Sequence, residues 1–138
     1  MGWTLNAGCG ADRWGEVRID IARVFNRQPS SLNLIADVSH LPFRDECIEL
    51  VKCSHVLEHL VLPAHGVAEL KRVLMPGGAA EIAVPINDGF RESMIVGLLA
   101  LSWGTLSNGF WMRRTREHKW IIKRSWLLSA FSGWSLKI

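Results

Sequence analysis

The sequence TLNAGCG at residues 4–10 decides the fold, because an apolar segment leads directly into a turn that contains two glycines. Gly8 and Gly10 permit positive φ angles, and they let a ligand approach the backbone without meeting a Cβ atom. A glycine turn after a strand is typical of nucleotide-binding sites, but a single G-x-G pattern has little specificity. Its meaning therefore depends on the residues at the ends of the later strands.

The rest of the chain alternates between strand and helix patterns. Strands are predicted at residues 3–7, 17–21, 32–36, 48–53, 79–84 and 134–138, and helices at 66–74 and 121–131. Pro76-Gly77-Gly78 is expected to end the first helix. This alternation predicts an α/β fold, a Rossmann-like, doubly wound and mostly parallel sheet in the order 3-2-1-4-5-6 with helices on both faces. The first crossover is short, so we expect at most one helical turn there, with Trp14 covering the sheet.

Size and composition indicate one soluble globular domain. The 138 residues suit a single domain over residues 1–138, in which the apolar segment 86–117 is expected to be a lid or a substrate-specific insertion. The net charge of +3 is too small to indicate a partner. Three cysteines without a CxxC pattern are expected to be reduced, which favours the cytoplasm. No signal peptide is predicted, and the longest apolar run is shorter than the roughly 20 residues of a transmembrane helix.

Polar residues follow three of the predicted strands. Asp20 ends the second strand, Asp37 follows the third and Ser54 follows the fourth. Ligands of parallel sheets bind at these carboxyl ends. A dinucleotide fingerprint would need a third glycine where Arg13 stands and an acid about 20 residues after the turn, so the pattern disfavours a nicotinamide cofactor.

Six segments occur in a fixed order along the chain: LNAGCG, VRID, ADVSHLPFRD, CSHVLEHL, LKRVLMPGG and AAEIAVP. Together they resemble the small type 11 kind of class I S-adenosylmethionine-dependent methyltransferase, over residues 4–85 and more weakly over 117–138. The resemblance implies S-adenosyl-L-methionine as the cofactor. It also implies a transferase that moves a methyl group in line onto a small-molecule or glycolipid-like acceptor.

The resemblance also implies a cofactor site. Asp20 would accept hydrogen bonds from the ribose hydroxyls and Asp37 from the adenine amine, with Leu41 and Phe43 covering the adenine. Asn6 stands where an acid is common in the family. The full set of expected cofactor-binding residues is Asn6, Ala7, Gly8, Cys9, Gly10, Asp20, Ile21, Asp37, Val38, Ser54 and His55.

The segment HVLEH at residues 55–59 also matches the H-x-x-E-H pattern of zinc proteases. A zinc site needs a third ligand on another element, and here the pattern follows a buried strand at once. We therefore expect no metal, and we expect Glu58 and His59 to orient the start of a helix and line the pocket. If the acceptor keeps its proton at neutral pH, the candidate bases are His59 and His118.

Two other function classes remain open. A cofactor-binding pseudo-enzyme or regulatory module is suggested by the short first crossover and by the lack of the family's usual seventh, antiparallel strand. A nucleic-acid methyltransferase is suggested by six Lys and Arg residues between positions 113 and 124. The absence of an N-P-P-Y-like motif disfavours it. A homodimer would cover the exposed sheet edge that the missing strand leaves.

Overall fold

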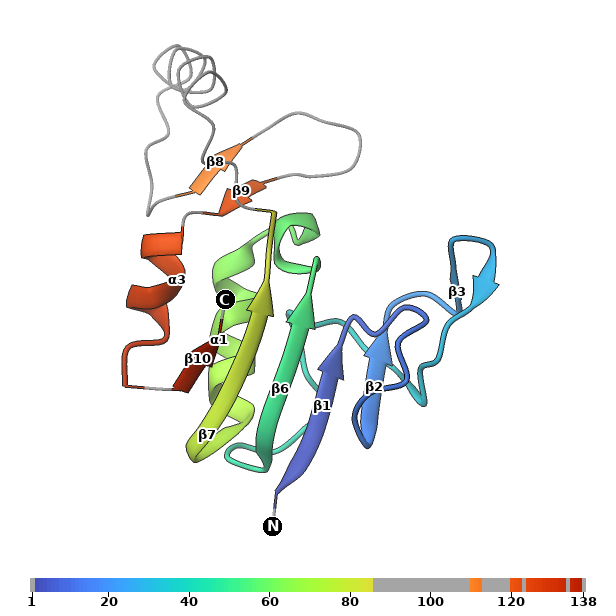
Figure 1. Ribbon diagram of the computed structural model, residues 1–138, viewed down its shortest axis with the longest axis horizontal. Helices are drawn as coiled ribbons and strands as arrows, with labels where there is room; N and C mark the ends of the chain where they lie inside the picture. The colour runs from blue at the N-terminus through green and yellow to red at the C-terminus, as the bar shows by residue number, and fades with distance from the viewer. Residues whose placement is uncertain (1, 86–109, 113–119, 123, 134, 138) are drawn as a thin grey trace.

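The computed structural model describes residues 2–85, 110–112, 120–122, 124–133 and 135–137 (Figure 1). Its centre is a six-stranded sheet in the order β10-β7-β6-β1-β2-β5, in which all the strand pairs are parallel. The strands are β1 (Trp3–Ala7), β2 (Val17–Asp20), β5 (Leu34–Ile35), β6 (Ile48–Ser54), β7 (Leu74–Ala83) and β10 (Ser135–Lys137). The predicted α/β class and the predicted strand order are confirmed.

Two α-helices and one short 3₁₀ helix connect these strands in the described residues. The 3₁₀ helix η1 (Leu57–His59) and α1 (Pro63–Val73) follow β6, and α3 (Arg124–Ala130) precedes β10. Pro63 suits the first turn of α1 because that position needs no intrahelical N–H bond. Lys71 Nζ donates a hydrogen bond to the Ala130 carbonyl at 2.7 Å, so α1 and α3 lie side by side.

The two faces of the sheet differ in chemistry. Paired residues at the centre of one face are buried in the core with both α-helices: Leu5, Val51 and Ala80. The next residues along the strands and their neighbours form a polar row on the other face: Asn6, Arg18, Lys52, Glu81 and Lys137. Such alternation is typical of a sheet with one solvated face. Among the described residues the helices thus cover one face, and not both as we expected.

Two element boundaries differ from the sequence prediction. Helix α1 ends at Val73, and Leu74 already has the extended angles φ −68° and ψ 129°. The Pro76-Gly77-Gly78 segment therefore lies inside β7 instead of ending the helix, and a register shift against β6 accommodates it. Burial of Leu74 in the core favours this earlier start of the strand. The predicted helix at 121–131 begins only at Arg124, because β9 (Trp120–Ile122) pairs with β8 (Phe110–Met112).

The connections around β2 contain no helix in the part of the chain that the structure describes. Residues 8–16 form turns, which agrees with the expectation of at most one helical turn there. Trp14 is half-buried, with its ring centre 5.7 Å from Lys52 Nζ on the polar side of the sheet. A small hairpin of β3 (Val24–Phe25) and β4 (Gln28–Pro29) turns at Asn26 and Arg27, whose φ angles are 48° and 64°. Positive φ at both turn residues matches the twist of adjacent antiparallel strands.

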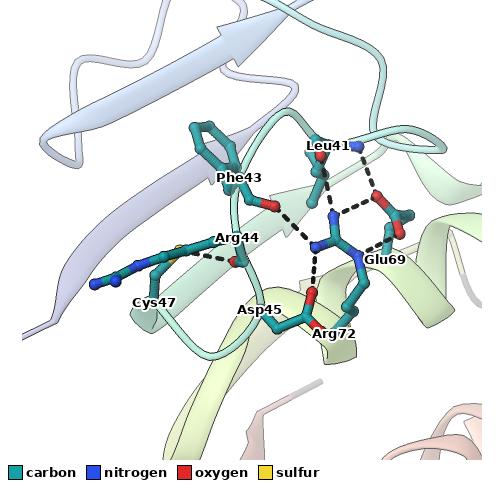
Figure 2. A network of polar contacts seen from close by, with 7 residues as sticks. All are labelled: Leu41, Phe43, Arg44, Asp45, Cys47, Glu69 and Arg72. Atoms are coloured by element: carbon teal, nitrogen blue, oxygen red, sulfur yellow. Dashed lines mark hydrogen bonds and ion pairs between the residues drawn. The ribbon is translucent and has the colours of Figure 1, made fainter.

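One arginine of α1 anchors the loop that precedes β6 (Figure 2). Arg72 donates hydrogen bonds to the carbonyls of Leu41 and Phe43 at 3.0 and 2.8 Å and to Asp45 Oδ1 at 2.7 Å. It also holds both carboxylate oxygens of Glu69, at 2.7 and 2.8 Å, and Glu69 in turn accepts the Leu41 N–H at 2.7 Å. The planar guanidinium suits this role because its fork satisfies several acceptors at once.

Replacing Arg72 should therefore destabilise the fold. Arg72→Ala leaves two carbonyls and two carboxylates without their donor, and we expect a loss of about 2 kcal/mol in the free energy of unfolding. Arg44→Ala is the matched control, because the Arg44 side chain is exposed and only its carbonyl is bonded, by the Cys47 thiol. Urea denaturation followed by circular dichroism measures both. An equal effect of the two variants would contradict the anchoring role.

The same contact predicts an acid-dependent part of the stability. Hydrogen bonding by Arg72 holds the pKa of Glu69 below its ordinary value of 4.5. A lowered folded pKa adds stability above the ordinary value, and that stability is lost as pH falls through the lowered value. Denaturation at a series of acidic pH values should show a shallower loss in Arg72→Ala than in the wild type. Parallel curves would show that this pair does not contribute.

Candidate functional site

A cleft of about 960 Å³ lies at the carboxyl ends of β1, β2 and β6. Residues from η1 and from the segment before α1 form its other wall. Of the residues expected at a cofactor, the following line it: Asn6, Gly8, Cys9, Gly10, Asp20, Ile21, Asp37, Val38, Ser54 and His55. The candidate base His59 lines it as well. The parallel strands thus bring residues 6 to 59 together, as the ends of such strands share one edge of a sheet.

The glycine turn is held against both β2 and η1. Gly8 has φ +77° and donates its N–H to the Ile19 carbonyl at 2.9 Å. A Cβ atom added to Gly8 would lie 2.1 Å from Val56 Cγ2, which no side chain tolerates. The backbone of the turn therefore packs directly on Val56 and exposes its edge to the cleft.

Asp20 supports this turn from the end of β2. Its Oδ2 accepts the Gly10 N–H at 2.9 Å and its Oδ1 accepts the Ala22 N–H at 3.1 Å. The side chain is half-buried, and each carboxylate oxygen has a further lone pair for a ligand. A structural role and a binding role are therefore compatible at this residue.

Asp37 lines the cleft from a compact loop after β5. Its Oδ1 accepts the Ser39 N–H at 2.7 Å, and its carbonyl accepts the His40 N–H at 3.0 Å. This self-bonded turn is typical of aspartate and fixes the carboxylate at the rim. Asp37 is exposed, whereas the next residue, Val38, is buried yet still contributes to the cleft wall.

Four of the residues singled out in the sequence lie elsewhere. Ala7 is fully buried and faces the core. Leu41 is also a core residue, and Phe43 lines a separate hollow beside Trp3. His118 and nearly all of the predicted lid at 86–117 lie outside the described residues, apart from the backbone of β8.

An ion pair that the motifs did not indicate also lines the cleft. Lys52 Nζ lies 2.7 Å from Asp12 Oδ2, and the two side chains are 28% and 42% exposed. The hydrogen bond from Lys52, followed by the Trp14 backbone N–H, lowers the pKa of Asp12. A signal that could have identified Lys52 is the alternation of apolar and polar residues along β6, in which Lys52 is the polar residue two positions before the strand ends.

The HVLEH segment forms a compact acid–histidine cluster at the cleft wall. His55 Nδ1 lies 3.4 Å and His59 Nε2 lies 4.0 Å from Glu58 Oε1, and Glu58 is fully buried. Burial, with the Glu58 charge as the second cause, raises the pKa of the neighbouring Cys53 thiol to about 12. Within the described ranges, no group of three or more His, Cys, Asp or Glu side chains is arranged to hold a metal ion.

The family is decided by the comparison with known protein families. A family model for the methyltransferase domain matches residues 5–82, which span the glycine turn, both acids and the HVLEH cluster. The chain belongs to this methyltransferase-domain family. The resemblance inferred from the six ordered segments is confirmed, and the sheet has the fold of class I S-adenosylmethionine-dependent methyltransferases.

Solved structures share the fold at low identity. An S-adenosylmethionine-dependent methyltransferase from Thermotoga maritima, described as a possible histamine N-methyltransferase, matches with a TM-score of 0.64 at 14% identity, over 94% of this chain and 61% of that chain. One from Methanosarcina mazei matches with a TM-score of 0.62 at 16% identity, over 94% and 76%. An uncharacterized 37.1 kDa protein of transposon Tn4556 from Streptomyces fradiae is 37% identical over 51 residues, which are 37% of this chain and 15% of that protein.

In the described residues, no helix is long and apolar enough to span a membrane.

The packing of the glycine turn can be tested with a matched pair of alanine substitutions. Gly8 and Gly77 have similar φ angles of 77° and 80°, but a Cβ at Gly77 would meet nothing within 4 Å. Gly77→Ala should lose roughly 1–2 kcal/mol of stability from its backbone conformation alone. Gly8→Ala should lose about 2 kcal/mol more, because it also overlaps Val56. Equal losses in urea denaturation would show that the Val56 contact does not constrain the turn.

Proposed function

We propose that the cleft binds S-adenosyl-L-methionine and that the protein transfers its methyl group to a small-molecule or glycolipid-like acceptor. The observation that carries this proposal is the arrangement of the glycine turn, Asp20 and Asp37 at the ends of three strands, around one cleft. The methyltransferase-domain family supports the cofactor. The volume of about 960 Å³ is within the upper range of small-molecule pockets.

The residues present fit the parts of this cofactor. Val56 fills the Cβ side of Gly8, and the backbone of the turn lines the cleft, where a ribose and a methionine chain can approach it. Asp20 has free lone pairs for the ribose hydroxyls, and Asp37, with the Val38 amide, suits the adenine edge. Ser54 and His55 would border the methionine end.

The chemistry needs little from the protein besides orientation. The cofactor supplies an electrophilic methyl carbon on a positively charged sulfur. Holding an acceptor in line with that carbon supplies about 7–11 kcal/mol through orientation. No covalent enzyme intermediate is required.

Apolar residues at the cleft wall suit an acceptor with an apolar part. Val61 and Leu62 line the cleft and are 73% and 49% exposed. Exposed aliphatic side chains at a binding site mark contact with an apolar ligand.

We keep the cytoplasmic location and the homodimer as predictions. The basic run at 113–124 lies almost entirely outside the described residues, and no described feature favours nucleic acid.

Calorimetric titration with S-adenosylhomocysteine tests the cofactor proposal. Wild-type protein should bind, and Asp20→Asn or Asp37→Asn should each weaken binding about tenfold to a hundredfold, because each removes a charge-assisted hydrogen bond. Glu46→Gln is the control, since Glu46 is exposed and does not line the cleft. Unchanged affinity in both aspartate variants would refute the assignment.

A further inference from the structure

Glu58 is a buried carboxylate without a hydrogen-bond partner. Its side chain has no exposed surface, and neither of its oxygens meets a donor in the described part of the chain. A buried polar group left in this state is costly, so its persistence calls for an explanation. The imidazoles of His55 and His59 lie beside Glu58, and His55 is the closer of the two.

His55 joins this carboxylate to the cleft. Its Nδ1 lies 3.4 Å from Glu58 Oε1, while its side chain is 65% exposed and lines the cleft. The backbone of His55 has φ +56°, which non-glycine residues rarely adopt, and its N–H is fixed to the Ala83 carbonyl at 2.8 Å. Strain of this kind persists where the surroundings hold a side chain in a required direction. The strained backbone therefore presents one imidazole nitrogen to Glu58 and leaves the other, Nε2, for a ligand.

We propose that His55 is the proton acceptor of the methyl transfer and that Glu58 is its positioning residue. The Glu58 charge, 3.4 Å from Nδ1, favours the imidazole proton on that nitrogen, so Nε2 offers a lone pair to the cleft. This deepens the proposed function and rests on it. It assigns the role of base to His55, which the sequence placed only beside the methionine end of the cofactor, instead of to His59 or His118.

The proposal specifies the class of acceptor. A base is useful only for a nucleophile that keeps its proton at neutral pH, such as a hydroxyl or a phenol. In the transfer, the acceptor's lone pair forms the bond to the methyl carbon, and the electron pair of the carbon–sulfur bond returns to sulfur. The proton of the acceptor passes to His55 Nε2. The imidazolium that results is balanced by Glu58 and later releases its proton to water.

Other charged groups share the cleft and belong in any account of its proton equilibria. His59 lies on η1 beside the same carboxylate, at 4.0 Å. The remaining ionisable groups of the lining are Cys9, Asp12, Asp20, Asp37, His40, Lys52 and His65. His55 Nδ1 and His59 Nε2 lie 3.4 and 4.0 Å from Glu58 Oε1, so a change at Glu58 should act first on these two imidazoles.

The tautomer of His55 is the most specific test. Long-range ¹H–¹⁵N spectra of ¹⁵N-labelled protein at neutral imidazole should show the proton on Nδ1, with the signal assigned by its loss in His55→Gln. In Glu58→Leu, which keeps a similar volume, Nε2–H should become the major tautomer because the acceptor is gone. His59→Gln is the control and should leave the His55 tautomer unchanged. Protonation on Nε2 in the wild type would overturn the dyad, whatever the Glu58→Leu spectrum shows.

Access to Nε2 is tested in the presence of the cofactor product. With S-adenosylhomocysteine bound, diethyl pyrocarbonate should modify His55 in mass spectrometry, and the modification should slow in Glu58→Leu. Complete protection of His55 would show that the cofactor covers its nitrogen, which would overturn the role of base. If S-adenosylhomocysteine does not bind at all, the proposed function fails and the transfer role fails with it. A wrong tautomer with normal binding refutes the dyad alone.

Discussion

The contact between the backbone of Gly8 and the side chain of Val56 is the constraint on which the site depends. It sets the glycine turn directly against the segment that follows β6, with no space for a Cβ atom between them. The same turn is bonded to β2 through the Ile19 carbonyl and through Asp20. These contacts hold the ends of β1, β2 and β6 together at one edge of the cleft, the rim, where the glycine turn presents backbone without a side chain.

The support for this rim is asymmetric. Apolar side chains of the sheet and of both described α-helices form one core, and Arg72 ties the loop before β6 to α1. The opposite face has a polar row that includes Lys52, whose ion pair with Asp12 reaches the cleft. A two-layer arrangement of the described residues can still build a complete rim, because the rim depends on strand ends and not on the second layer of helices.

The sequence predicted the features that follow from local patterns. Strand ends carrying Asp20 and Asp37 were identified because apolar segments stop there, and the alternation of strands with helices indicated a parallel sheet. The start of β7 was not predicted, since proline and glycines usually end helices and the burial of Leu74 is a tertiary effect. The pairing of His55 with Glu58 was also missed, because it needs a positive φ angle that no sequence pattern at a histidine announces.

The most direct test of the central claim is a crystal structure with S-adenosylhomocysteine bound. We predict the ribose hydroxyls within hydrogen-bond distance of Asp20, the adenine amine at Asp37 and the sulfur near Ser54, with His55 Nε2 still open to the remaining space. A ligand bound away from the Gly8 turn, or a ribose that does not contact Asp20, would contradict the account.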